Sequence, residues 1–128
     1  MKATPQRGHA EVWPEAEIRS RLTEELPRWE YAEGAIRRRY RVHGWKGAMM
    51  AANAVAHLAE VAFHHPDLEI SWGSVLVKLH THSSKGVTNR DFELARKIEE
   101  LMQWQPGREG GALEGTPDDP RYAYLRDD

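Results

Sequence analysis

Residues 60–91 read EVAFHHPDLEISWGSVLVKLHTHSSKGVTNRD and hold four of the seven histidines of the chain. His64 and His65 precede Pro66, and a residue before proline is biased away from the helical region, so a helix should end here. Residues 75–82 then alternate along the chain, as a half-buried strand does, and finish with two more histidines. Histidines from separate parts of this stretch are therefore expected near one another.

The same stretch predicts a β-hairpin. Residues 68–72 alternate Leu, Ile and Trp with Glu and Ser, which gives this strand an inner and an outer face. Residues 75–82 form the second strand. Gly73-Ser74 between the two runs is a two-residue turn signal.

Another hairpin is expected earlier, with strands at 29–32 and 35–42 on either side of Glu33 and Gly34. Glycine readily adopts the positive φ that a tight turn of this kind requires. Three arginines share one parity of the 35–42 strand, which is typical of the solvated face of an antiparallel strand. They do not by themselves indicate a nucleic-acid interface.

Three helices complete the pattern, at about 14–25, 45–63 and 88–104. The first has apolar residues at helical spacing, and the second is rich in alanine and methionine. The third has Thr88 in the N-cap position and Asp91 three residues later, a variant of the capping box with Asp in place of Glu.

The expected fold class is α+β. Elements in the order α-β-β-α-β-β-α predict a four-stranded antiparallel sheet with three helices on one face. This domain should span 14–104, with a flexible leader at 1–13. A Gly- and Pro-rich tail follows at 105–128. It is expected either to be disordered or to pack against the domain or a neighbouring molecule.

Composition limits the possible functions. At 128 residues the chain is long enough for one core. It has no cysteine, which excludes disulfides and thiolate chemistry. A net charge of −2 argues against a nucleic-acid partner, because phosphate binding needs a basic face. No apolar run is long enough to span a bilayer, so no membrane association and a cytoplasmic location are expected.

The clustered histidines have three interpretations. Imidazole is a common metal ligand, but adjacent His64 and His65 rarely aim at one ion, and such a site usually recruits a carboxylate. The histidines are alternatively ordinary surface residues. The third interpretation is acid/base catalysis, because neutral and protonated imidazoles coexist near neutral pH. Elimination of water needs both forms, one to protonate the departing hydroxyl and one to accept a proton.

The spacing Glu60-x3-His64-His65-Pro66-x5-Trp72-x9-His82-x8-Asp91 resembles the signature of the pterin-4a-carbinolamine dehydratases at every position. The similarity extends over roughly 14–104. It implies dehydration of a 4a-hydroxytetrahydropterin to the quinonoid dihydropterin plus water, with no metal and no cofactor.

The resemblance also implies roles for individual residues. His64 and His82 are expected to be the catalytic acid/base pair. His65, Glu60 and Trp72 are expected to bind the pterin substrate.

Two motif residues, Pro66 and Asp91, are interpreted as structural, Asp91 as a helix cap. His80 departs from the family pattern, which usually has a small hydroxyl residue two positions before the last histidine.

The resemblance further implies a homodimer or homotetramer. The alternative function is that of a catalytically inactive relative acting as an assembly factor or chaperone, for example for Rubisco in carboxysome-containing bacteria. The tail at 105–128 is the segment through which such a protein client would bind.

Overall fold

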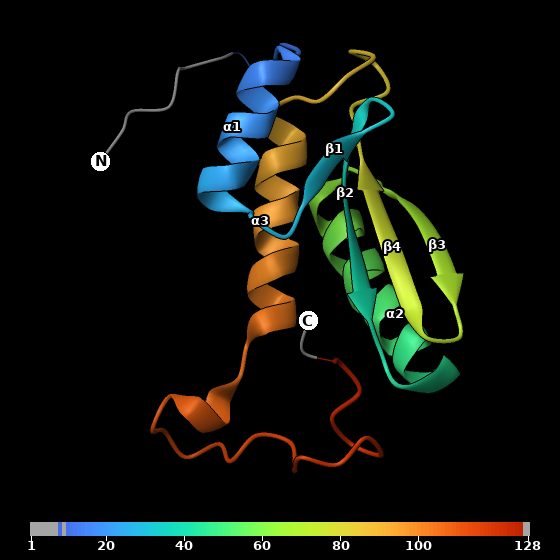
Figure 1. Ribbon diagram of the computed structural model, residues 1–128, viewed down its shortest axis with the longest axis vertical. Helices are drawn as coiled ribbons and strands as arrows, with labels where there is room; N and C mark the ends of the chain where they lie inside the picture. Colours follow the sequence, from blue (N-terminus) through green and yellow to red (C-terminus); the bar gives the residue numbers. More distant parts are fainter. Residues whose placement is uncertain (1–7, 9, 127–128) are drawn as a thin grey trace.

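The computed structural model describes residue 8 and residues 10–126, so most of the predicted leader lies outside the described residues. The helices are α1 (Glu15–Glu25), α2 (Gly44–Ala62) and α3 (Asn89–Gln103). The strands are β1 (Glu30–Ala32), β2 (Ala35–Arg41), β3 (Asp67–Ser71) and β4 (Ser74–Leu79). They form one antiparallel sheet in the order β1-β2-β4-β3, and the helices lie on one of its faces (Figure 1). This confirms the predicted architecture.

The turn between β1 and β2 is the one predicted. Glu33 and Gly34 both have positive φ, 53° and 77°, between the paired residues Ala32 and Ala35. Two successive positive φ values suit the right-handed twist of the strands that the turn connects. Glycine in the second position adopts the larger positive φ without the steric cost of a Cβ at that position.

Gly34→Ala is expected to lower the free energy of unfolding by about 1 kcal/mol, because a left-handed conformation costs an L-residue about 1–2 kcal/mol. Gly111→Ala is the control, since it has no positive φ and a Cβ there would meet nothing within 4 Å. Urea denaturation of both variants measures the difference. Equal stability of the two would contradict this account of the turn.

The second hairpin turns one residue earlier than predicted. Ser71 pairs with Ser74, so the two turn residues are Trp72 and Gly73. The second turn position is again a glycine. The prediction had put Gly73 in the first turn position, which placed the turn one residue too late. Trp72 therefore lies in the turn rather than in the strand, and its side chain is 72% exposed.

The core lies between the sheet and the helices. Its strand residues share one parity of β2 and β4, and α2 and α3 cover them. Apart from alanines, the core residues with no exposed surface are Ile36, Val55, Val75, Val77, Leu79, Phe92 and Ile98. Trp13, at the end of the predicted leader, is also buried and contacts the Phe92 ring edge-on at 5.5 Å between centroids.

A polar cluster is buried where α3 crosses β2. The Arg38 guanidinium forms an ion pair with the Glu99 carboxylate, and both side chains are largely buried, at 6% and 13% exposed. The Tyr40 hydroxyl donates to the same Glu99 oxygen at 2.5 Å. Burial, and then the hydrogen bond to Glu99, raise the pKa of Tyr40 well above its ordinary value.

The opposite face of the sheet carries charged side chains. Arg39 and Arg41 are exposed there, as the strand pattern predicted. Glu69 forms an ion pair with Lys78 on the neighbouring strand. The hydrogen bond that Lys78 donates to Glu69, and then the positive charge of Lys78, lower the pKa of Glu69.

The tail returns to the domain. After a short 3-10 helix at Pro106–Arg108, its end runs beside the end of β2, where Val42 and Leu125 form an antiparallel bridge. The His43 N–H donates to the Tyr124 carbonyl at 2.8 Å. The tail therefore contacts its own domain at 124–126.

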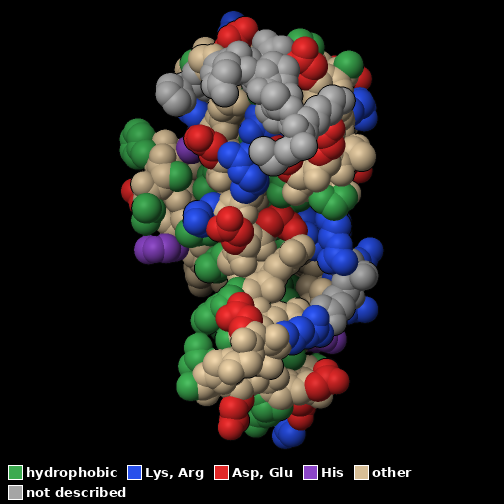
Figure 2. All heavy atoms as spheres, turned by 90° about the vertical axis from the view of Figure 1, so that its left-hand side faces the viewer, with side chains coloured by type: hydrophobic (Ala, Val, Ile, Leu, Met, Phe, Trp, Pro, Cys, Tyr) green, Lys and Arg blue, Asp and Glu red, His purple; other side chains and the backbone are tan. Residues whose placement is uncertain are grey.

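The surface on the side of α1 and α3 has acidic and basic side chains interspersed rather than one basic patch (Figure 2). No helix in the described part of the chain is both long and apolar enough to cross a membrane.

Candidate active site

The motif residues lie at one corner of the fold, where α2 ends, β4 ends and α3 begins. His64 follows α2, Thr81 follows β4, and Asp91 is in the first turn of α3. The register Asp67↔Lys78 places the start of β3 beside the end of β4. Segments far apart in the sequence are therefore neighbours here.

The end of α2 turns the chain toward this corner. Phe63 has left-handed backbone angles, φ 50° and ψ 45°, and the His64 N–H donates to the Ala59 carbonyl at 3.1 Å. A left-handed residue after the last helical turn is a common way to satisfy terminal carbonyls. Pro66 then leads into β3, in agreement with the predicted helix end.

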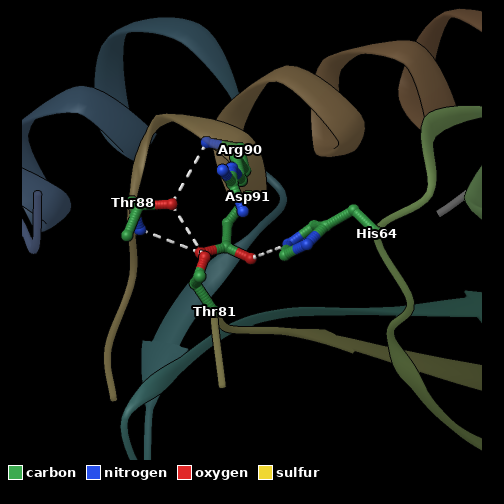
Figure 3. A network of polar contacts seen from close by, with 5 residues as sticks. All are labelled: His64, Thr81, Thr88, Arg90 and Asp91. Carbon is green, nitrogen blue, oxygen red and sulfur yellow. Dashed lines mark hydrogen bonds and ion pairs between the residues drawn. The ribbon is translucent and has the colours of Figure 1, made fainter. Parts of the chain in front are cut away.

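A buried carboxylate organises the corner (Figure 3). Asp91 is fully buried, and its Oδ1 lies 2.6 Å from His64 Nε2. Its Oδ2 accepts from the Thr81 hydroxyl and from the Thr88 N–H, each at 2.8 Å. Three hydrogen bonds offset the cost of burying this carboxylate.

The hydrogen-bond donors in this network can be assigned. Thr81 donates its one hydroxyl hydrogen to Asp91, so the 2.7 Å contact between Thr81 and Thr88 must use the Thr88 hydroxyl as donor. The Thr88 oxygen in turn accepts from the Arg90 N–H at 3.2 Å. His64 Nε2 faces Asp91 Oδ1, so Nδ1 is the ring nitrogen left for proton exchange with a ligand.

Asp91 therefore does more than cap a helix. The predicted capping box is present, with Thr88 as N-cap and Asp91 in the third helical position. The second oxygen of the same carboxylate orients the His64 ring, as a buried aspartate does in hydrolase triads. Asp91 is thus a positioning residue for His64.

Thr81→Val is expected to destabilise the protein by about 1–3 kcal/mol, because it removes a donor to the buried Asp91 carboxylate and the acceptor for Thr88. The substitution keeps the shape of the side chain. Thr23→Val, at an exposed position of α1, should change stability by less than about 0.5 kcal/mol. Chemical denaturation of both variants tests this; a similar small effect of the two would show that the network contributes little.

His65 lies on the solvent side of the corner. Its Nε2 is 2.8 Å from Glu60 Oε1, and the two side chains are 52% and 76% exposed. Its ring also meets the Phe63 ring edge-on, with 5.5 Å between centroids. The structure therefore brings together two residues expected to bind substrate, on a surface rather than in a closed cavity.

His82 belongs to a tight loop. The Thr81 N–H donates to the Gly86 carbonyl and the Lys85 N–H to the Thr81 carbonyl, both at 2.8 Å. The loop presents His82 to solvent, with its ring 4.1 Å from the ring of His80 between centroids.

A shallow pocket of about 380 Å³ lies beside these rings. It is lined by Glu33, Gly34, His80, His82, Lys85 and Gly86. His64 is not on its wall; it connects to the His82 loop through Asp91 and Thr81.

Trp72 is not part of this corner. It lies in the turn at the far end of β3 from His65, and a strand of five residues spans about 17 Å. The Trp72 ring lies beside the start of α2, since a Cβ added to Gly44 would be 3.8 Å from it. Within one chain, Trp72 therefore lies at the opposite end of the hairpin from His65 and the corner that holds His64.

Two residues near the site, Thr81 and Asp67, were missed in the sequence. Thr81 gave no signal, because a threonine in an alternating strand has many roles. Asp67 lay just outside the predicted strand at 68–72 and was given no role, although its side chain lies close to His80 and His82.

Residues 11–101 match the family described as "Pterin 4 alpha carbinolamine dehydratase". The chain belongs to this family.

The chain is similar to several bacterial proteins provisionally named pterin-4-alpha-carbinolamine dehydratase. One from Aquifex aeolicus (strain VF5) is 43% identical over 89 residues, covering 70% of this chain and 89% of the relative. One from Thermomicrobium roseum is 45% identical over 80 residues, covering 62% and 86%.

Among solved structures, the chain resembles a transcriptional coactivator/pterin dehydratase from Brucella melitensis. The TM-score is 0.64 at 29% identity, covering 71% of this chain and 98% of that one. The dehydratase-family part of the chain thus contains the whole histidine corner.

Proposed function

We propose that this protein dehydrates a 4a-hydroxytetrahydropterin to the quinonoid dihydropterin, with His64 and His82 as the acid/base pair. The observation that carries the proposal is the contact of the buried Asp91 carboxylate with His64, at 2.6 Å. This contact prepares one imidazole for proton transfer. Through Thr81, the same carboxylate also holds the start of the loop that carries His82.

The reaction needs two proton transfers. The C4a–OH bond breaks as the hydroxyl gains a proton and leaves as water, and a neighbouring ring N–H gives up its proton to a base. His64 and His82 supply the acid and the base, and the net proton count of the protein is unchanged after one turnover. One positioned group of this kind contributes about 10²–10⁴-fold to the rate.

His65 and Glu60 are proposed to hold the pterin. Their side chains are joined to each other and are open to solvent, so they offer hydrogen-bonding groups to a flat heterocycle with N–H and C=O edges. Trp72, if it binds substrate, would do so from a second copy of the chain, because in its own chain it lies at the far end of the hairpin.

Homo-oligomerisation is proposed on the basis of exposed apolar side chains. β3 is an edge strand of the sheet, with a row of backbone groups available for pairing. The exposed large apolar residues on or next to α2 are Trp45, Met50, Val61 and Phe63. Light scattering on the purified protein tests the proposal, and a monomer at micromolar concentration would oppose it.

The activity is tested by adding the full-length protein to a chemically generated 4a-hydroxytetrahydropterin and following its decay. Dehydration should accelerate in proportion to protein concentration. His57→Ala, at an exposed position of α2, should be as active as the wild type. A decay rate independent of protein concentration would reject the proposal.

A second function, binding of a protein client, is favoured only by exposed apolar side chains in the tail, Leu113 and Tyr122. Co-purification with the full-length protein and with a chain ending at Trp104 tests it. A partner retained by both, or by neither, would exclude the tail as its binding site.

A further inference from the structure

We propose that Asp67, His80 and His82 form a binding site for a divalent transition-metal ion such as Zn²⁺, and that the ion inhibits the enzyme by occupying His82. Each of the three side chains offers one ligand atom, and these atoms all lie within 4.8 Å of one another. The inhibitory part of the proposal rests on the proposed dehydratase function; the metal site itself does not.

The backbone explains why the three side chains meet. Asp67 begins β3 opposite Lys78, and His80 is two residues beyond Lys78. Residues two apart on an extended chain point to the same side, so Asp67 and His80 both project from the open face of the sheet. The tight loop after Thr81 then returns the His82 ring to within 4.1 Å of the His80 ring.

The three side chains are available to an ion. Within the described part of the chain, none of them makes a side-chain hydrogen bond or ion pair. Lys78, the cation nearest to Asp67 in the register, is instead paired with Glu69. Asp67 and His82 are exposed, and His80 is half-buried, so the first two can rotate toward the third.

The donor set fits Zn²⁺ and its neighbours in the transition series. Two imidazoles and one carboxylate, with a position left open, are a common ligand set for such ions. Zinc binds these atoms at about 2.0–2.2 Å, so a tetrahedral ion holds its ligands about 3.4 Å apart. The ligand atoms lie within 4.8 Å of one another, so the exposed Asp67 and His82 side chains would rotate inward to reach that separation.

Metal binding and catalysis would compete for one residue. A metal ion bound to a ring nitrogen of His82 occupies the lone pair that would accept a proton. That nitrogen could then act neither as an acid nor as a base. Asp67 and His80 have no part in the proposed proton transfers. Replacing them should therefore remove the metal effect and leave the metal-free reaction unchanged.

The test uses untagged, full-length protein freed of metal with a chelator. Calorimetric titration with Zn²⁺ should show one ion per chain, and Co²⁺ should give the visible absorption of a low-coordinate complex. His80→Ser and Asp67→Asn should each weaken Zn²⁺ binding by at least about 10–100-fold, since loss of even an outer partner of a metal ligand costs that much. His57→Ser, which removes an exposed histidine from α2, should bind like the wild type.

In the dehydration assay, Zn²⁺ should inhibit the wild type reversibly, and His80→Ser should be active and resistant. Unchanged Zn²⁺ affinity in His80→Ser and Asp67→Asn would overturn the metal site. Zinc binding lost in these variants but without inhibition of the wild type would overturn the competition at His82. If the metal-free protein has no dehydratase activity, the proposed function fails, and the calorimetry still decides the metal site.

Discussion

Replacing His82 with alanine is expected to slow dehydration about 10²–10⁴-fold and to leave the free energy of unfolding nearly unchanged. His82 is exposed, and its side chain makes no hydrogen bond within the described part of the chain. Its loss should therefore remove a proton-transfer group without disturbing the fold. The measurement is the initial rate at saturating substrate, together with a urea denaturation curve.

His64→Ala should lower the rate by a similar factor but should also destabilise the protein by about 1–3 kcal/mol, because the buried Asp91 carboxylate loses a donor. The two variants should therefore lose similar activity, but only His64→Ala should lose stability. His57→Ala should change neither quantity. A rate for His82→Ala within about threefold of the wild type would remove His82 from the acid/base pair.

The largest expected effect on stability is that of Glu99→Ala, about 3–5 kcal/mol. Glu99 forms an ion pair with Arg38 and accepts from Tyr40, and these groups lie between α3 and β2. Its removal leaves a guanidinium in a place from which water is largely excluded. Removing one partner of a buried pair costs more than the pair contributes, since the other charge remains buried.

Glu100→Ala is the matched control for this prediction. Glu100 is the next residue of α3, and its ion pair with Lys97 is exposed, with side chains 63% and 68% accessible for Lys97 and Glu100. An exposed pair contributes at most about 1 kcal/mol. Thermal or urea unfolding of both variants compares them, and an equally small loss from Glu99→Ala would mean that the buried cluster does not stabilise α3 on the sheet.

Local patterns were sufficient to predict the elements. Alternation gave the strands, Glu33-Gly34 gave one turn, and Thr88 with Asp91 gave the start of α3. Each of these depends on residues close in sequence, where spacing fixes which side chains share a face. The turn at Trp72-Gly73 was misplaced by one residue because Gly73 fits either of two adjacent turn positions.

The contacts of the site were beyond the reach of spacing alone. Asp91 was correctly predicted to cap α3, but its contact with His64 joins residues 27 positions apart. Likewise, Asp67 meets His80 and His82 only because β3 and β4 pair in a particular register. Such contacts depend on how elements pack, which the order of elements does not specify.

The most direct test of the proposed acid/base pair compares the wild type with the double variant His64→Ala/His82→Ala in dehydration of a chemically generated 4a-hydroxytetrahydropterin. Equal concentrations of the two folded proteins are used, and the spontaneous rate is subtracted. We expect the wild type to be faster by at least about 10²-fold. A wild type no faster than the double variant would contradict catalysis by these histidines.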